Sequence, residues 1–179
     1  MYSFSMLAYI ITLRGIFMIG KKEIVELLDK NNIKYELIEH EAVFTMEDID
    51  KLNIKDKGVE VKNLFLRDEK GKNHYLIVAK EDTNIDMKEL KNIINSTRLS
   101  FASEERLNKY LKLTRGCVSP FGILNDDLKE VKVFIDMKLK NESRIGVHPN
   151  ENTSTIFVST SDIEKIIKCN GNFVSYVNI

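Results

Sequence analysis

Residues 61–79 read VKNLFLRDEKGKNHYLIVA, two apolar runs on either side of a charged tip. The runs, 61–67 and 73–79, are rich in β-branched and aromatic residues, and the tip between them contains Gly71. Strand-forming runs separated by three to five residues that include a glycine predict a β-hairpin. We therefore expect two neighbouring antiparallel strands in this part of the chain.

Helix and strand patterns are intermixed outside the hairpin. Before it we expect a helix over Lys21–Asn31, where Ile24, Leu27 and Leu28 recur at helical spacing, a strand over Lys34–His40 and a short helix capped by Thr45. After it we expect helices over Met87–Ile94 and from the cap Ser103 to Leu111, followed by strands over Val131–Ile135 and Thr155–Val158. The capping box Ser161–Glu164 should open a further helix that Gly171 ends. The last expected strand covers Phe173–Val177. This mixture predicts the α+β (mixed α/β) class, a single domain with a mixed, largely antiparallel sheet flanked by helices.

Composition limits the class of protein further. The 179 residues suffice for one domain and leave little room for two. The 27 basic and 27 acidic residues cancel, which argues against a general positive coat for nonspecific nucleic-acid binding. Cys117 and Cys169 are too few for a disulfide-stapled secreted fold, which favours a reducing cytoplasm. Neither they nor the histidines are spaced as a metal set, and no glycine-rich phosphate loop is present, so we expect no metal and no cofactor.

The first 19 residues differ from the rest of the chain. Met1–Ile16 is apolar apart from Arg14 and a few hydroxyl side chains. A secretion signal is one interpretation, but no basic segment precedes the run and no small-residue cleavage site follows it. The run is also shorter than the roughly 20 residues that cross a bilayer, so we expect no membrane association. We favour Met18 as the true start, with residues 1–19 an apolar extension and residues 20–179 the folded domain.

Two loops carry both prolines of the chain together with several polar side chains. They read Gly116-Cys117-Val118-Ser119-Pro120-Phe121-Gly122 and Gly146-Val147-His148-Pro149-Asn150-Glu151-Asn152-Thr153. Glycine lets the backbone approach a ligand, proline fixes a turn, and the polar residues offer hydrogen-bonding groups. Together the loops predict the walls of a pocket. Each loop alone is better explained as an ordinary turn whose polar side chains bond to nearby backbone.

Lys62 is a cation at the start of an otherwise apolar strand. Burial of an ammonium group is unfavourable unless the group is paired or used, and a compact cation suits a phosphate or a developing oxyanion. From the residues alone, a lysine whose amino group reaches solvent is the better explanation. By the same reasoning His40 and His74 are ordinary surface or satisfied residues.

A family resemblance adds what these patterns alone do not supply. Four segments occur in order: Lys62-Asn63-Leu64-Phe65-Leu66-Arg67-Asp68, Arg98-Leu99-Ser100-Phe101-Ala102-Ser103, Val118-Ser119-Pro120-Phe121-Gly122 and Gly146-Val147-His148-Pro149-Asn150-Glu151-Asn152-Thr153-Ser154-Thr155. This set resembles the YbaK-type, prolyl-tRNA-synthetase-associated editing domains, and specifically their ProX branch, over Gly20–Ile179. The resemblance implies a YbaK-like fold and a freestanding deacylase that hydrolyses alanine mischarged on proline tRNA, without a cofactor.

The resemblance also implies roles for individual residues. Lys62 matches the essential lysine of the family, which we assign to binding the acceptor end of the RNA and offsetting negative charge. Gly146 and His148 match its G-x-H-P loop, whose backbone would position the carbonyl or the attacking water while His148 bounds the amino-acid pocket. The remaining expected substrate-binding residues are Phe44, Asn63 and Leu64 around the pocket, Ser119, Pro120 and Gly122 on the facing loop, and Asn152 and Thr155 as support behind His148. With no Ser-His-Asp or Cys-His set evident, we expect attack by water assisted by the substrate and no acyl-enzyme.

The RNA must be held by a local basic patch, because the net charge is zero. We expect Arg67, Lys70 and Lys72 on or beside the hairpin to form it, joined by Arg98 and Arg115 near the mouth of the pocket. The alternative is that these are ordinary surface charges. The partners implied are the acceptor end of aminoacylated proline tRNA and prolyl-tRNA synthetase, and a monomer is favoured.

Substrate preference stays open at this point. Rejecting proline by a steric clash is easy, whereas one missing methyl group discriminates by only about 1 to 3 kcal/mol, so glycine should be cleaved better than proline. Arg115 and Cys117 stand where a Pro-Gly-Ser order is usual in the family. The alternatives are therefore a deacylase for cysteine on proline tRNA and a regulatory module that binds aminoacyl-tRNA or senses proline metabolism without cleaving it.

Overall fold

The computed structural model describes residues 18–42 and 55–179. Its central element is the predicted hairpin, in which strands β2 (Val59–Arg67) and β3 (His74–Lys80) pair antiparallel. The turn is closed by the Asp68 carboxylate, which accepts hydrogen bonds from the backbone N–H of Lys72 and the side-chain amide of Asn73 at 2.8 and 2.7 Å. The hairpin prediction is confirmed.

The described strands form one eight-stranded mixed sheet in the order β1-β7-β6-β2-β3-β5-β8, with β4 also pairing with β2. Four of the seven ladders are antiparallel, whereas β2–β6, β3–β5 and β5–β8 are parallel. The remaining strands are β1 (Tyr35–Glu39), β4 (Ser100–Phe101), β5 (Val131–Asp136), β6 (Ile145–Val147), β7 (Ser154–Val158) and β8 (Val174–Val177). The mixed α/β class with a mixed sheet is confirmed.

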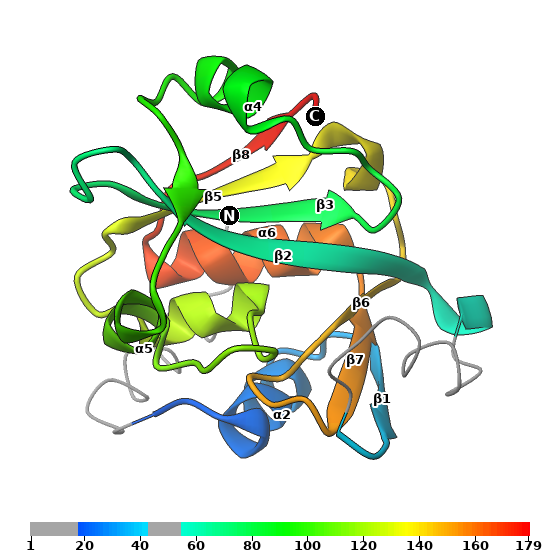
Figure 1. The fold of residues 1–179 in the computed structure, drawn as a ribbon. Helices are drawn as coiled ribbons and strands as arrows, with labels where there is room; N and C mark the ends of the chain where they lie inside the picture. The colour runs from blue at the N-terminus through cyan, green and yellow to red at the C-terminus, as the bar shows by residue number, and fades with distance from the viewer. Residues whose placement is uncertain (1–17, 43–54) are drawn as a thin grey trace.

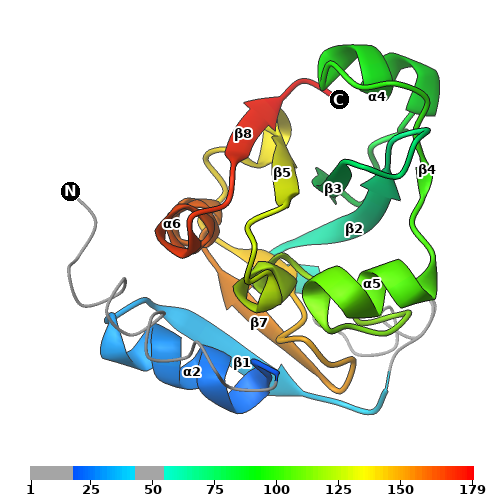
Figure 2. The same ribbon diagram turned by 90° about the vertical axis from the view of Figure 1, so that its left-hand side faces the viewer.

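Helices cover both faces of this sheet (Figures 1 and 2). The larger core lies under α2, α5 and α6 and includes Leu27, Leu111 and Ile166, whereas a smaller core lies under α4 and includes Leu90. The described helices are α2 (Lys21–Lys30), α4 (Met87–Ile93), α5 (Glu104–Leu111) and α6 (Thr160–Asn170), with 3-10 turns η1 (Lys55–Lys57), η2 (Pro120–Asn125) and η3 (Met137–Leu139). Each α-helix was expected from an apolar stripe or a capping residue, because such a stripe is buried only when the helix packs on a neighbour.

Buried amides fasten η2 to the end of α6. The side-chain amide of Asn170 donates to the carbonyl of Ile123 at 2.7 Å, and that of Asn172 donates to the Asp126 carboxylate at 2.6 Å. All three side chains are almost fully buried, so each bond satisfies a polar group that water does not reach. The loop that begins at Ser119 therefore leads into a fixed support.

Two local expectations need correction. Helix α6 is capped by Ser159, whose hydroxyl accepts from the Asp162 N–H at 3.1 Å, and not by the predicted box that begins at Ser161. Ser159 has the extended backbone that a cap requires, so the helix starts two residues earlier than expected. The short elements β4, β6 and the 3-10 turns were not predicted, because two to six residues are too few to show a period.

Some expectations fall outside the described residues. They are the apolar extension up to residue 17, the helix capped by Thr45, and Phe44. Within residues 18–42 and 55–179, no helix is both long and apolar enough to span a bilayer.

Candidate active site

The sheet splits along one edge of β2. The ladder to β6 ends at the pair Glu60–Gly146, and the ladder to β4 begins at Leu66–Phe101. Between these pairs lie residues 61–65, whose other edge stays bound to β3. The segment with the predicted site residues Lys62, Asn63 and Leu64 therefore occupies the place where the sheet divides.

Lys62 lies half-buried at this split. Its ammonium group donates a hydrogen bond to the backbone carbonyl of Glu81 at 2.7 Å, and the N–H of Glu81 in turn donates to the carbonyl of Glu60 at 3.1 Å. Burial raises the pKa of the Glu81 carboxyl, while the charge of Lys62 opposes that rise. The lysine is thus held by a neutral carbonyl, and no salt bridge of Lys62 is among those of the described residues. Its positive charge remains available to an anion.

Asn63 and Leu64 point to opposite faces of β2, because side chains alternate along a strand. Leu64 packs against the smaller core. The amide oxygen of Asn63 is buried and has no hydrogen-bond partner in the structure. An unpaired buried acceptor is unfavourable, so a donor supplied by a ligand would satisfy it.

Gly146 and His148 lie directly beside this segment. Gly146 pairs with Glu60, and Lys62 and His148 each lie two residues further along these parallel strands. The two segments that the sequence assigned to one pocket are thus neighbours in the sheet, although 84 residues separate Lys62 from Gly146. A Cβ atom on Gly146 would lie 3.1 Å from the Phe157 ring, which gives this glycine a packing role as well.

Ser119 joins the second predicted loop to the first. Its hydroxyl donates to the backbone carbonyl of His148 and accepts from the Phe121 N–H at 3.2 Å, and Ser119 is fully buried. Pro120 and Gly122 are buried just behind it, and a Cβ on Gly122 would lie 2.7 Å from the Leu113 side chain. The structure gives these two residues a supporting position, and their contact with a substrate remains a prediction.

His148 itself is turned into its own loop. Its Nδ1 lies 3.1 Å from the carbonyl of Glu151, and burial lowers its pKa, which a positive charge on the nearby His40 would lower further. The Glu151 carboxylate accepts hydrogen bonds from the hydroxyls of Thr153 and Ser154, each at 2.8 Å, and forms an ion pair with Lys21 at 3.0 Å. The loop is therefore closed by its own polar groups and tied to α2. Asn152 lies half-buried within it.

His40 belongs to this group and was missed by the sequence analysis. Its Nε2 lies 3.0 Å from the Thr155 hydroxyl, and its Nδ1 lies 2.7 Å from the carbonyl of Glu41. Thr155 was expected to support the His148 loop, and its contact is with the His40 ring. A single histidine at the end of a strand forms no sequence motif that would indicate a functional site. Only the pairing of β1 with β7, across more than 100 residues, brings it to Thr155.

The basic residues expected to hold RNA are divided between two places. Arg67, Lys70, Lys72 and Arg98 gather at the hairpin tip, on the left of Figure 1, while Arg115 lies on the loop that leads to Ser119. The tip is five residues along β2 from Lys62, about 17 Å at 3.3 Å per residue. Arg67 is also engaged, because its guanidinium donates to the carbonyls of Asp68 and Glu69 at 2.9 Å each. The structure thus brings only Arg115 close to the predicted loops.

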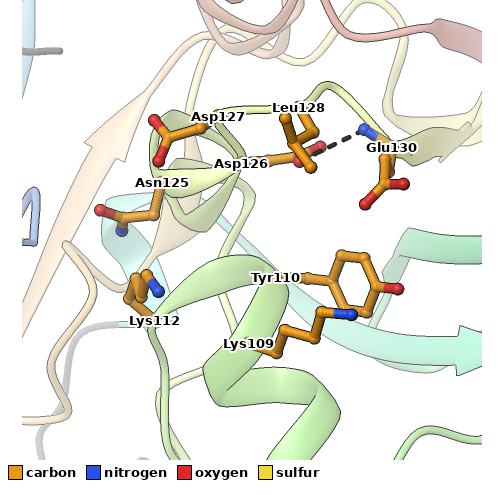
Figure 3. Close-up of a pocket in the computed structure, with 8 residues that line it drawn as sticks. All are labelled: Lys109, Tyr110, Lys112, Asn125, Asp126, Asp127, Leu128 and Glu130. Atoms are coloured by element: carbon orange, nitrogen blue, oxygen red, sulfur yellow. Dashed lines mark hydrogen bonds between the residues drawn. The ribbon is translucent and has the colours of Figure 1, made fainter.

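Two hollows lie outside the split. One, of about 150 Å³, lies between α5 and the end of η2 and is shown in Figure 3; its lining residues are Lys109, Tyr110, Lys112, Asn125, Asp126, Asp127, Leu128 and Glu130. It contains none of the predicted site residues, and the Asp126 carboxylate is already bonded to the backbone N–H of Val131 at 2.9 Å. The other, of about 390 Å³, is lined by Lys34, Tyr35, Glu36, Ser143, Arg144 and Phe157 and touches the site only through Phe157, behind Gly146.

Comparison with known proteins agrees with this geometry. Residues 40–166 match the family model for the aminoacyl-tRNA editing domain. The chain is 53% identical over 153 residues to the "Prolyl-tRNA editing protein ProX" of Acetoanaerobium sticklandii, covering 86% of this chain and 93% of that protein. It is 31% identical over 156 residues to the "Prolyl-tRNA synthetase associated domain-containing protein 1" of Mus musculus, covering 85% of this chain and 92% of that protein.

A solved structure shares the fold. The crystal structure of a candidate trans-editing enzyme for prolyl tRNA synthetase superposes with a TM-score of 0.66 at 16% identity, covering 89% of this chain and 96% of that one. At this identity the match concerns the fold alone. The family match covers the split in the sheet and both loops that close it. The chain therefore belongs to the aminoacyl-tRNA editing domain family.

Proposed function

We propose that this protein is a trans-acting editing hydrolase that cleaves the ester of alanine mischarged on proline tRNA. The observation that supports the proposal is the β2–β6 ladder, which brings the segments of Lys62, Gly146 and His148 side by side at the split in the sheet, with Ser119 bonded to the His148 carbonyl. The name of the relative that is 53% identical supports proline tRNA as the substrate. In this proposal editing acts in trans, on tRNA charged by a separate enzyme.

The chemistry requires one cation, one shaped pocket and one water molecule. Water adds to the carbonyl carbon of the aminoacyl ester, the bond from that carbon to the ribose oxygen breaks, and the ribose oxygen takes a proton. The ammonium of Lys62 offsets the negative charge of the terminal phosphate or of the developing oxyanion. The Gly146–His148 backbone positions the carbonyl or the attacking water, and the neighbouring ribose hydroxyl assists the attack.

Selectivity for alanine rests on space. The His148 carbonyl is fixed by the buried Ser119, and the His148 ring is fixed by its own loop. The side of the pocket formed by His148 is therefore rigid. A rigid small pocket excludes proline by clash, while it admits alanine and glycine. Asn63, with its unpaired amide oxygen, faces the opposite side of β2 and supports the adenosine end of the substrate.

The RNA approaches along one side of the protein in this proposal. Arg115 holds the acceptor end, and Arg67, Lys70, Lys72 and Arg98 reach the stem further away, where an exposed basic cluster attracts phosphates. Prolyl-tRNA synthetase is a candidate partner, a monomer suffices for the reaction, and the cytoplasm is the compartment in which we expect it.

Deacylation assays test the proposal. Purified protein is incubated with alanyl-, cysteinyl- and prolyl-tRNA of the proline acceptor, and the remaining ester is followed over time. We expect loss of alanine with prolyl-tRNA spared. Loss of cysteine alone would show the other editing activity, and binding without turnover would show a regulatory module.

Matched lysine variants identify the site in the same assay. Lys62→Ala should lower the rate by about a hundredfold, because a charge-stabilising group contributes that much in comparable sites. Lys80→Ala, on the neighbouring strand, removes an exposed lysine that pairs with Asp82 and should leave the rate unchanged. Equal rates for the Lys62 variant and the wild type would rule out this site.

A further inference from the structure

The contact between His40 and Thr155 has a defined direction. The Glu41 carbonyl can only accept a hydrogen bond, so the His40 Nδ1 that lies 2.7 Å from it carries the proton. In the neutral ring the Nε2 is then an acceptor, and the Thr155 hydroxyl, at 3.0 Å, must donate to it. Thr155 has thereby used its only proton. What its oxygen still offers is a pair of acceptor sites.

Thr155 presents this oxygen next to the predicted site. It lies on the strand beside β6, and its methyl carbon would lie 3.4 Å from a Cβ atom on Gly146. Its side chain is therefore on the same face of the sheet as Gly146. Thr155 and Lys62 both lie just beyond the last pairs of the ladders that β6 makes with β7 and β2, so they flank the end of β6 from its two sides.

The surroundings favour a positively charged donor over an anion. Burial lowers the pKa of His148, so this neighbouring ring is neutral and adds no positive charge of its own. The groups nearest in the loop are carbonyls and the Glu151 carboxylate, whose charge is balanced by Lys21. An ester of an amino acid carries one such donor close to its carbonyl, the α-ammonium group. A phosphate, by contrast, would find its cation at Lys62.

We propose that Thr155 accepts a hydrogen bond from the α-ammonium group of the aminoacyl ester, with His40 as a positioning residue that acts through Thr155. This inference rests on the proposed function, because it assigns a subsite within the same pocket. The amino acid then lies at the Thr155 end, the ester carbonyl beside the Gly146–His148 backbone, and the terminal phosphate toward Lys62. Such a subsite makes the protein read the free amino group and reject peptidyl or acylated esters.

Binding of a non-hydrolysable substrate analogue tests the subsite without relying on turnover. The probes are adenosine carrying alanine in amide linkage at its 3′ position and the same compound with its amino group acetylated. Wild-type protein should bind the free amine at least tenfold more tightly. Thr155→Val, which keeps the shape and removes the hydroxyl, should abolish this preference by weakening only the free-amine complex. Thr155→Ser should retain it.

Variants of His40 separate positioning from a merely structural role. His40→Phe removes the acceptor and keeps a ring, so it should reduce the preference to the same degree as Thr155→Val. His40→Gln keeps an acceptor and should restore part of the preference. Thr97→Val is the matched control, because Thr97 is an exposed threonine beside the hairpin tip whose hydroxyl accepts from the Glu69 N–H, and it should bind both probes as the wild type does.

The outcomes are distinguishable from failure of the proposed function. If Thr155→Val weakens both probes equally, or neither, while melting normally, the subsite is wrong. If the wild type shows no preference for the free amine, the subsite is also wrong, whatever the rate of deacylation. If the preference follows Thr155 and His40 but no aminoacyl-tRNA is cleaved, the subsite stands and the hydrolase assignment fails.

Discussion

The buried hydroxyl of Ser119 donates a hydrogen bond to the backbone carbonyl of His148, joining two loops that are 29 residues apart. Each loop alone is an ordinary turn with glycine and proline. Together they form one wall of the candidate site, because the Ser119 oxygen also accepts from the Phe121 N–H and so fixes the start of η2. The shape of the pocket therefore depends on a contact between loops and not on either loop by itself.

Replacing Ser119 by alanine should weaken both the fold and the site. The change leaves the His148 carbonyl and the Phe121 N–H without their buried partner, which costs about 1 to 3 kcal/mol. We expect the free energy of unfolding in urea to fall by that amount and the rate of alanyl-tRNA deacylation to fall with it. Ser161→Ala, an exposed serine on α6, is the control and should stay within about 0.5 kcal/mol of wild type. An unchanged unfolding midpoint for Ser119→Ala would contradict the argument.

Gly146→Ala tests whether the glycine of the G-x-H-P loop is required by packing. The added Cβ would lie 3.1 Å from the Phe157 ring, closer than an ordinary contact, so the ring or the strand must shift. Overpacking of this kind costs about 1 to 3 kcal/mol. The second variant, Phe157→Leu, removes the obstructing ring carbon.

The double variant should separate packing from chemistry. If Phe157→Leu restores the unfolding free energy of Gly146→Ala but not its deacylation rate, the glycine backbone is needed in the reaction as well. Restoration of both would mean that Gly146 serves packing alone. The coupling between the two changes, measured in a double-mutant cycle, should exceed about 0.5 kcal/mol because the side chains are in contact.

The elements that could be predicted from the sequence are those with a repeating pattern. Two apolar runs around Gly71 predict the β2–β3 hairpin, and a capping serine followed by an apolar stripe predicts α5. Strand β6 could not be recognised, because Ile145–Val147 is three residues long and its pairing with β2 joins segments more than 80 residues apart. Non-local pairing of this kind leaves no periodic trace in the chain.

The same distinction applies to the site. Lys62, Gly146 and His148 are expected site residues from a family resemblance, and the parallel β2–β6 ladder explains physically why their segments are neighbours. From the sequence, His40 is expected to be an ordinary surface or satisfied residue, because a lone histidine is more often that than a ligand. Its partner is Thr155, on the strand to which β1 pairs, so only the register of the sheet could reveal the contact. The basic hairpin tip lies about 17 Å from Lys62 along β2, and RNA binding there stays a prediction.

Asn150 ties the His148 loop to the start of α2. Two substitutions at this position separate the contribution of its side-chain amide from that of its left-handed backbone conformation. The residue has a φ of 64°, and its side-chain amide donates to the Ile19 carbonyl at 2.8 Å. Asn150→Gly removes the amide and tolerates this φ, whereas Asn150→Ala removes the amide and also resists the left-handed conformation by about 1 to 2 kcal/mol. Both variants should unfold at lower urea concentration than wild type, and alanine should be the worse of the two. Equal midpoints for the two variants would show that the conformation contributes nothing.

Protonation of His74 should contribute to a loss of stability between about pH 6.5 and pH 4, alongside that of His148, whose pKa is also lowered by burial. His74 is almost fully buried against the rings of Phe65 and Tyr110, and its Nε2 lies 2.8 Å from the Arg106 guanidinium. Burial, together with the charge of Arg106, lowers its pKa from 6.5 to about 4. The unfolded chain therefore takes up a proton below pH 6.5 that the folded chain refuses until about pH 4. Stability is complete above pH 6.5 and is lost as the pH falls.

Urea unfolding at a series of pH values measures this loss. At pH 5 the stabilisation that depends on neutral His74 should have fallen by about 2 kcal/mol relative to pH 7.5. The carboxyl groups of Asp68, Glu36 and Glu151 have pKa values lowered from 3.8 and 4.5, so their contribution is lost mainly below the measured interval of pH 7.5 to pH 5. His74→Phe keeps an aromatic ring against Phe65 and Tyr110 and cannot titrate. Whatever its absolute stability, its unfolding free energy should vary less between pH 7.5 and pH 5 than that of wild type, and an identical slope would show that another group is responsible.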